Sequence, residues 1–194
     1  MKKIAVLTSN KSIIFESLNK FFKDINYPVE IKLVSTNFSC DNYVAKENLT
    51  EYFQVENFDI VVVDCYEDYL DDRLLDSGKF LKIQYSLLPA FEGNNEIARA
   101  YSSGVKVSGI TIYYPNSDIE KLKIVAQYPI LIKNNDHFDD FKSNICELAK
   151  VMSPYVIKSV LEDTVFDYSD MFSHKDKCSG ECSGCKSSCN KPLS

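Results

Sequence analysis

Four cysteines near the end of the chain form the densest group of potential ligands in this 194-residue sequence. They are Cys178, Cys182, Cys185 and Cys189, in the spacing Cys-x3-Cys-x2-Cys-x3-Cys. The serines and glycines between them allow the tight turns that thiolates need to surround one zinc ion or one iron–sulfur cluster. The spacing therefore predicts a metal or cluster site, with His174 as a further candidate ligand. A redox-reactive tail and an undefined disulfide pair are the alternatives.

The polar run directly after the first apolar segment is a candidate anion site. It follows residues 3–8 and consists of Ser9, Asn10, Lys11 and Ser12. Backbone N–H groups at the start of a helix attract negative charge, and ligands of open α/β sheets bind beyond the carboxyl ends of the strands. The run therefore predicts either a site for an anionic group or a plain helix cap.

Three sequence blocks indicate a family. The first is Ser-Leu-Leu-Pro-Ala-Phe at residues 86–91, the second is Gly-Val-Lys-Val-Ser-Gly-Ile-Thr at 104–111, and the third is Ile-Val-Ala-Gln at 124–127, followed by Pro129. In this order and spacing they resemble the signature of the folate-dependent formyltransferases, above all the glycinamide ribonucleotide transformylases of purine synthesis. The resemblance extends over residues 3–160. It implies that Leu87, Leu88 and Pro89 contact the substrate.

The resemblance also implies where a reaction centre would lie. In the family, an amine attacks the formyl carbon of a 10-formyl folate, and an Asn donates a hydrogen bond to the developing oxyanion. A His assists, and an Asp positions the His or a water that relays protons. By alignment, the Asn falls on Lys82, the His on Gln84 and the Asp on Glu120, with Asp118 as an alternative for the last.

The replaced residues change the chemistry that we expect. Lys82 can donate to an oxyanion or occupy a phosphate or carboxylate subsite, whereas Gln84 cannot take up or release a proton near neutral pH. The loop after the first strand lacks the family's glycines, which restricts backbone approach to a phosphate. We therefore expect a formyltransferase-like protein whose catalysis is altered or lost. The alternative is a non-enzymatic binding or regulatory module whose cysteine tail responds to metal or redox state.

The pattern of apolar residues predicts the scaffold that positions these groups. Apolar runs predict strands at 3–8, 29–34, 59–64, 80–85, 105–114 and 124–132. The pattern predicts helices at 11–23, 42–53, 96–102 and 139–160, the last kinked or divided at Pro154, and a short helix or turn at 68–75. This alternation predicts a doubly wound α/β domain with a mainly parallel sheet, a final antiparallel pair and a C-terminal helix. We expect a domain at 1–163, a linker at 164–177 and the Cys-rich tail at 178–194.

Composition narrows the class of partner. A formal net charge of -6 argues against binding along a nucleic-acid backbone. No apolar run approaches the roughly 20 residues of a membrane helix. We therefore expect a cytoplasmic protein with a small-molecule ligand and with neither a nucleic-acid nor a membrane partner. Cys40, Cys65 and Cys146 are expected to be buried or half-buried small apolar side chains.

The remaining residues of interest receive structural interpretations. His137 precedes the last helix in a polar loop and is expected on the surface. Tyr85, Tyr113 and Tyr114 are expected to serve in packing. The acidic pair at residues 67–68, which follows the third predicted strand, is a poor host for a phosphate and predicts a solvated face.

Overall fold

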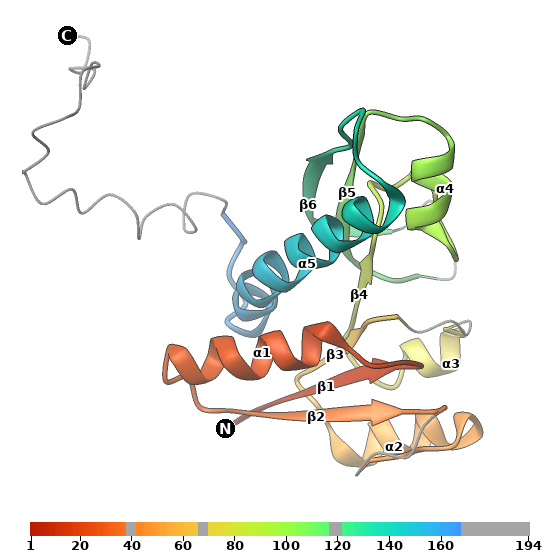
Figure 1. Cartoon of the computed structure of the whole chain (residues 1–194). Coiled ribbons are helices and arrows are strands. Elements are labelled where there is room, and N and C mark those ends of the chain that lie inside the picture. Colours follow the sequence, from red (N-terminus) through yellow and green to blue (C-terminus); the bar gives the residue numbers. More distant parts are fainter. Residues whose placement is uncertain (38–41, 66–69, 117–121, 168–194) are drawn as a thin grey trace, which may run out of the picture.

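The computed structural model describes residues 1–37, 42–65, 70–116 and 122–167, and a six-stranded sheet lies at the centre of this part (Figure 1). The strands are β1 (Lys2–Thr8), β2 (Val29–Ser35), β3 (Ile60–Val63), β4 (Phe80–Gln84), β5 (Val107–Tyr114) and β6 (Lys123–Leu131). Their order is β2-β1-β3-β4-β5-β6. The first four pair in parallel, whereas β5 is antiparallel to both β4 and β6. The predicted mainly parallel sheet with a final antiparallel pair is confirmed.

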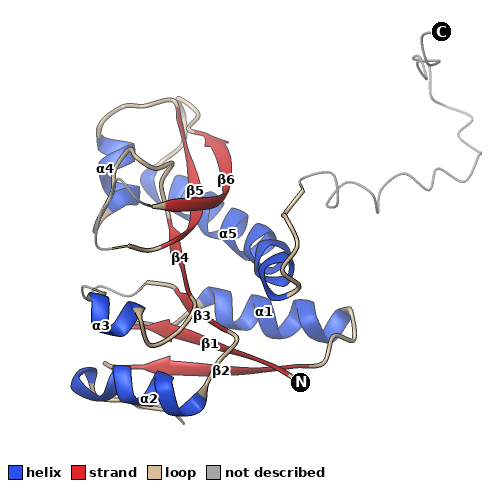
Figure 2. Cartoon of the chain, turned by 180° about the vertical axis from the view of Figure 1, so that it is seen from behind, coloured by secondary structure: helices blue, strands red, loops and turns tan. Residues whose placement is uncertain are grey.

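Helices cover both faces of the sheet, as the view from behind in Figure 2 shows. They are α1 (Ile13–Asp24), α2 (Leu49–Glu56), α3 (Asp72–Leu75), α4 (Glu96–Ser102) and α5 (Phe138–Leu161), with a short 3-10 helix, η1 (Lys46–Asn48), before α2. The helices α1 and α5 share one hydrophobic core with the sheet, and α2 and α3 share a second one. The fold is thus a mixed α/β fold with helices on both sides.

The central strands supply both cores because neighbouring residues of a strand point to opposite faces. In β1, Ile4 and Val6 join the core under α1 and α5, while Ala5 and Leu7 join the core under α2 and α3. All four residues of β3 are buried. A strand that is covered on both faces needs apolar side chains on both, and this is why continuous apolar runs located the strands.

The helix α5 continues through its proline, so of the kink or division predicted at Pro154, the division is wrong. A proline has no N–H to donate to the carbonyl four residues earlier, which here belongs to Lys150. The hydroxyl of Ser17 on α1 donates to that carbonyl oxygen at 2.5 Å instead. Because the neighbouring helix supplies the missing donor, the lost hydrogen bond does not end α5.

Besides α3, which starts at Asp72 within the region 68–75 predicted as a short helix or turn, two helices begin later than predicted. The first is α1, for which Ser12 is the N-cap residue and accepts a hydrogen bond from the N–H of Phe15 at 3.1 Å. The second is α2, which starts only at Leu49, after the turn of η1. The start of α1 matters for the site because it leaves Ser9, Asn10 and Lys11 in the loop between β1 and the helix.

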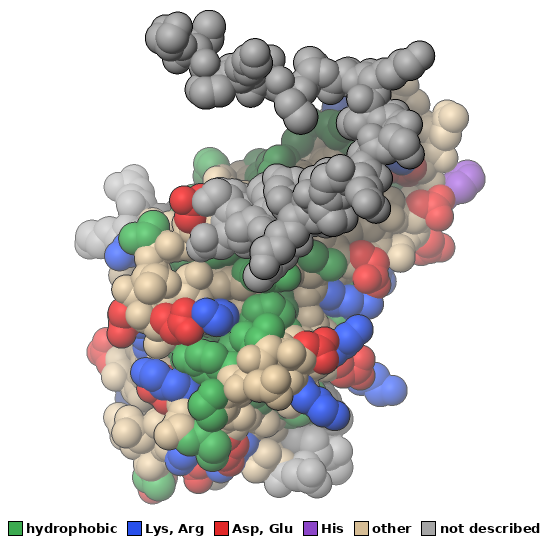
Figure 3. Space-filling view, turned by 90° about the vertical axis from the view of Figure 1, so that its left-hand side faces the viewer, with side chains coloured by type: hydrophobic (Ala, Val, Ile, Leu, Met, Phe, Trp, Pro, Cys, Tyr) green, Lys and Arg blue, Asp and Glu red, His purple; other side chains and the backbone are tan. Residues whose placement is uncertain are grey.

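The surface carries charges of both signs. Figure 3 shows one face, on which a broken strip of hydrophobic side chains runs between basic and acidic groups. No helix in the described ranges is long and apolar enough to cross a bilayer. The cysteine tail and residues 168–177 lie outside these ranges, so the predicted linker and tail boundaries stay predictions.

Candidate functional site

A pocket of ≈ 540 Å³ lies at the carboxyl ends of β1, β3 and β4. The strand order reverses between β1 and β3, because the chain first moves outward to β2 and then returns to the other side of β1. Ligands of open α/β sheets bind at such switch points. The lining comes from the strand ends, from the segment at 93–98 and from α5, and it includes Asn10, Lys11, Cys65, Lys82, Gln84, Glu96, Phe138, Lys142 and Cys146.

Asp64 joins the three strand ends beside this pocket. It follows β3 directly and is 0% exposed. Its carboxylate accepts hydrogen bonds from the Ser12 hydroxyl at 2.6 Å and from the Tyr85 hydroxyl at 2.7 Å. Burial, followed by the negative charge of Asp64, raises the pKa of Tyr85 well above its ordinary value, so this hydroxyl stays protonated and donates. The Ser12 hydroxyl is therefore engaged in the fold, as an N-cap and as a donor to Asp64.

Lys82 brings an amine into the pocket from the middle of β4. It pairs with Val63 on one side and Tyr113 on the other, and its side chain is half-buried. Loss of hydration lowers the pKa of the amine below its ordinary value of 10.5, and the negative charges of Glu96 and Glu92 oppose this shift. The amine makes no hydrogen bond or ion pair with any residue that the structure describes.

Gln84, at the end of β4, holds the pocket wall in place. The residue is 2% exposed, and its side-chain amide donates to the carbonyl oxygen of Gly93 at 3.0 Å. Gly93 has a φ of 89°, a left-handed conformation that a glycine adopts without a Cβ clash. The Gln84 amide thus fixes the segment that leads into α4. It carries no group that titrates near neutral pH.

The loop at residues 86–91 is held by two side chains of the antiparallel pair. The Thr111 hydroxyl donates to the carbonyl oxygen of Ser86 at 2.7 Å and accepts from the N–H of Leu88 at 3.0 Å. The Gln127 amide donates to the carbonyl oxygen of Leu88 at 2.9 Å and to the Thr111 hydroxyl at 3.1 Å. The peptide bond between Leu88 and Pro89 is cis. The polar groups of β5 and β6 thus set the path of this loop.

Gly109 on β5 lets the same loop approach the antiparallel pair. A Cβ atom at this position would lie 2.0 Å from the carbonyl oxygen of Tyr128 and 2.8 Å from a methyl carbon of Leu87. Neither distance is tolerable for carbon. Gly109, the second of the two glycines in the block at residues 104–111, is therefore required by close packing.

The opposite wall of the pocket is anchored at α4. The guanidinium of Arg99 donates to the carbonyl oxygen of Phe91 at 2.7 Å and also to that of Glu92. Glu96, the first residue of α4, accepts a hydrogen bond from the N–H of Tyr85 at 3.3 Å. One carboxylate oxygen of Glu96 is therefore held by the backbone just after β4, in the lining of the pocket that Lys82 also enters.

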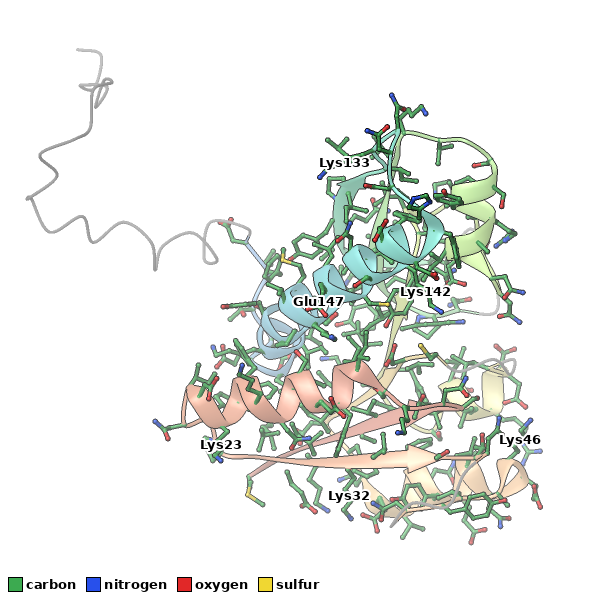
Figure 4. The ribbon with its side chains drawn as sticks, viewed as in Figure 1. Lys23, Lys32, Lys46, Lys133, Lys142 and Glu147 are labelled. Atoms are coloured by element: carbon green, nitrogen blue, oxygen red, sulfur yellow. The ribbon has the colours of Figure 1, made fainter. Side chains whose placement is uncertain are left out.

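Positive charges outnumber negative ones along the pocket. Lys11, Lys82 and Lys142 line it, against the carboxylate of Glu96. Figure 4 shows Lys142 on the N-terminal half of α5. Lys11 and Lys142 are exposed and, within the described part of the chain, form no hydrogen bond or ion pair. In a chain of net charge -6, this local excess of positive charge favours an anionic ligand.

Two thiols also face the pocket. Cys65 follows Asp64 with a φ of 51°, and its thiol donates to the Asp64 carboxylate at 3.5 Å. The expectation that Cys65 is buried or half-buried is wrong, because the residue as a whole is exposed, whereas Cys146 is half-buried as predicted. Packing around the sulfur atoms raises the pKa of both thiols, and the Asp64 charge adds to this effect at Cys65. Both sulfurs are therefore protonated at neutral pH.

The structure brings together only part of the site that the sequence predicts. Asn10, Lys11, Lys82 and Gln84 meet at the pocket, and Ser9 lies buried at its edge. The loop residues Leu87, Leu88 and Pro89 lie outside its lining. Glu120, Asp118, Cys40, His174 and the four tail cysteines fall outside the described residues, so their proposed roles stay predictions.

Sequence reasoning missed four groups of the site: Asp64, Glu96, Lys142 and Cys146. Asp64 could have been found, because a carboxylate directly after a fully apolar strand is a recognisable signal at a carboxyl-end site. Lys142 and Cys146 come from α5, and nothing local in the sequence indicates that this helix closes the pocket. His137 is exposed, and Tyr85 and Tyr113 are buried, as predicted.

Comparisons with known proteins agree with this architecture. A phosphoribosylglycinamide formyltransferase of Bacillus subtilis is 28% identical over 186 residues, covering 83% of this chain and 95% of the relative. A formyltetrahydrofolate deformylase of Synechocystis is 26% identical over 159 residues, and the match spans 75% of this chain but only 55% of that relative.

Solved structures show the same fold. The phosphoribosylglycinamide formyltransferase of Bacillus halodurans superimposes with a TM-score of 0.74 at 24% identity, covering 86% of this chain and 100% of the other. A formyltetrahydrofolate deformylase of Pseudomonas syringae gives 0.72 at 19% identity, covering 86% and 66%. The family model described as "Formyl transferase" matches residues 38–157. With more than half of its length matched in this way, the chain belongs to the formyl transferase family.

Proposed function

We propose that this protein binds an anionic small molecule, a formyl folate or a phosphorylated sugar amine, without catalysing formyl transfer by the family's acid–base route. The observation that carries the proposal is Gln84. Its amide is buried and committed to the carbonyl of Gly93 at 3.0 Å, in the position where the resemblance calls for a His that assists proton transfer. General acid–base assistance contributes about 10²–10⁴-fold in rate, and an amide cannot supply it.

The pocket itself fits a ligand of this class. Small-molecule sites usually enclose about 300–1,000 Å³, and this pocket measures ≈ 540 Å³. The amines of Lys11 and Lys142 line it and are not engaged by other described residues, so a folate carboxylate or a phosphate would neutralise them. The residues therefore suit the binding of a folate, which would supply a formyl group. Gln84, which stands where the resemblance calls for the family's His, cannot supply the proton transfer that assists its release.

A paired assay of binding and transfer tests this proposal. Thermal unfolding is measured with a formyl folate and with glycinamide ribonucleotide, and formyl transfer between them is measured with the Bacillus subtilis relative as positive control. A ligand at about 100-fold its dissociation constant is expected to stabilise the protein by about 2.7 kcal/mol. No transfer above the uncatalysed rate is expected. Transfer comparable to that of the relative would contradict the loss of activity, and no stabilisation by either ligand would contradict the binding role.

The spacing of the tail cysteines supports a second candidate function, a metal- or redox-responsive element. Four thiolates within 12 residues can enclose zinc or an iron–sulfur cluster. The full chain, purified without oxygen, is expected to carry zinc or iron, and Cys182→Ala with Cys185→Ala is expected to abolish it, while Ser183→Ala retains it. Elemental analysis and visible absorption distinguish zinc from iron. A metal-free wild-type chain would remove this candidate.

A further inference from the structure

Lys82 places an amine in an unusual setting within the pocket. The residues on either side of it in β4, Leu81 and Ile83, are buried in the core, and the lysine itself is half-buried on the pocket side of the strand. A lysine in the middle of a central strand is costly to desolvate unless its charge is paired. Here the described residues offer it no hydrogen bond or ion pair.

The two nearby carboxylates do not pair with this amine directly. Glu96 and Glu92 act on it through space, and the loss of hydration outweighs both, so that the pKa of Lys82 is lowered. A lower pKa increases the fraction of amine that is neutral, and the neutral form is the nucleophile. An exposed lysine such as Lys106, which donates to Asn134 at 3.1 Å, lacks this setting.

For the two thiols and the Tyr85 hydroxyl of the pocket, the surroundings raise the pKa and so disfavour the reactive, deprotonated form. Packing around the sulfur atoms raises the pKa of the thiols of Cys65 and Cys146, which disfavours their reactive thiolate form near neutral pH. The Tyr85 hydroxyl donates to Asp64 and stays protonated. Among the amine of Lys82, the two thiols and the Tyr85 hydroxyl, the amine is therefore the one group whose surroundings favour its reactive form.

We infer that Lys82 is a reactive amine that captures an aldehyde or ketone bearing a phosphate or carboxylate, as a reversible Schiff base within this pocket. The amine nitrogen attacks the carbonyl carbon and forms a C–N bond, and the carbonyl oxygen takes up a proton. The carbinolamine then loses water and leaves a C=N bond to Lys82, so that one carbonyl and one amine give one imine and one water. Neither an oxidant nor a reductant is needed.

The neighbouring charges fit the two ends of such a ligand. Glu96, whose carboxylate is held by the N–H of Tyr85 at 3.3 Å, has the strongest charge effect on Lys82 and is placed to exchange protons with the carbinolamine. Lys11 and Lys142 line the same pocket and attract the anionic end. This activity goes beyond the proposed binding of a folate or sugar amine and does not depend on it.

Chemical trapping tests the inference on the full chain. The protein is treated with a low concentration of pyridoxal phosphate, a phosphorylated aldehyde, reduced with borohydride, digested and analysed by mass spectrometry. We expect Lys82 to be modified at least about tenfold more than Lys106, because only Lys82 presents a partly desolvated amine inside the pocket. Before reduction, the imine with pyridoxal phosphate is followed by its visible absorbance. Lys82→Arg should remove this absorbance, whereas Lys106→Arg should retain it.

The anionic end is tested with a matched probe. Pyridoxal, which lacks the phosphate, should label Lys82 more weakly, and inorganic phosphate or Lys142→Gln should reduce labelling by pyridoxal phosphate. Lys82→Met, which keeps an apolar stem, serves as a second variant whose thermal midpoint reports on folding. Modification of Lys82 no greater than that of Lys106 in the wild-type protein would overturn the capture. Equal labelling by both probes would overturn the anionic requirement.

Discussion

The loop at residues 86–91 and the strand β4 that leads into it are neighbours, yet they differ in how they match the formyl transferase family. The loop carries the family's Ser-Leu-Leu-Pro-Ala-Phe block, and the polar groups that hold it, Thr111 and Gln127, belong to the other two blocks. The strand carries Lys82 and Gln84 where the resemblance calls for Asn and His. The loop therefore matches the family's signature, whereas two side chains of the strand beside it differ from that signature.

The difference shows what each set of residues does. The three blocks meet in one network, in which side chains of β5 and β6 satisfy the backbone of the loop. Buried polar groups must be paired, so such a network fixes the path of the chain and contributes to stability. Lys82, by contrast, makes no hydrogen bond in the described structure. Its replacement should therefore change ligand binding more than the stability of the fold.

Gly109→Ala should give the largest effect on the loop side of this comparison. The new Cβ atom would lie 2.0 Å from the Tyr128 carbonyl oxygen, so β5 and β6 would have to separate. We expect a loss of about 3–5 kcal/mol in the free energy of unfolding, or no soluble protein. Gly78→Ala is the control, because its Cβ atom would meet side chains no closer than 3.5 Å. A Gly109→Ala protein as stable as Gly78→Ala would contradict the packing argument, and urea unfolding measures both.

Thr111→Val tests the hydrogen-bond network with little change in volume. It removes the bonds to Ser86, Leu88 and Gln127 and leaves the buried N–H of Leu88 without its partner. We expect a loss of about 2–4 kcal/mol. Ser108→Ala, on the same strand, removes a buried hydroxyl that has no hydrogen-bond partner in the described structure, and it should be neutral or slightly stabilising. Similar losses for the two variants in urea unfolding would show that the network does not hold the loop.

The sequence predicts those features of the fold that depend on local patterns, and it misses those that depend on long-range contacts. The apolar runs at 3–8 and 59–64 located β1 and β3 because both strands are covered on two faces. The segment at 96–102 was predicted with both of its helix ends. The division at Pro154 failed because the compensating donor, Ser17, lies 133 residues away in the sequence. A long-range hydrogen bond leaves no local pattern.

The candidate site was likewise predicted only in part. Asn10 and Lys11 follow from the end of the first strand, which a local pattern reveals, whereas Lys82 and Gln84 follow from the resemblance to the family's signature. Other features of the site depend on tertiary contacts: the pairing of Gln84 with Gly93, and the closure of the pocket by α5. Sequence reasoning therefore located the carboxyl edge of the sheet, but it did not find the groups that α5 adds.

The smallest effect on stability that we predict concerns the polar hub, the hydrogen-bonded group of Ser12, Asp64 and Tyr85 at the strand ends. This effect depends on pH. Burial and the charge of Asp64 raise the folded-state pKa of Tyr85 well above 10.0. Below pH 10.0, the ordinary pKa of a tyrosine, the hydroxyl is protonated in both the folded and the unfolded chain. Between pH 10.0 and the folded-state pKa, the unfolded chain loses the proton while the folded chain keeps it. The free energy of unfolding therefore falls by up to about 1.4 kcal/mol per pH unit for this one group.

Tyr85→Phe separates this effect from the rest of the hub. Near neutral pH the variant should be less stable by about 1–3 kcal/mol, because Asp64 loses a buried donor. Above about pH 10 the difference from wild type should narrow, since the variant no longer has the shifted phenol. Urea unfolding between pH 7 and about pH 11 measures both quantities. A constant difference over this range would mean that Tyr85 ionises equally in the folded and the unfolded state, which would contradict the raised pKa.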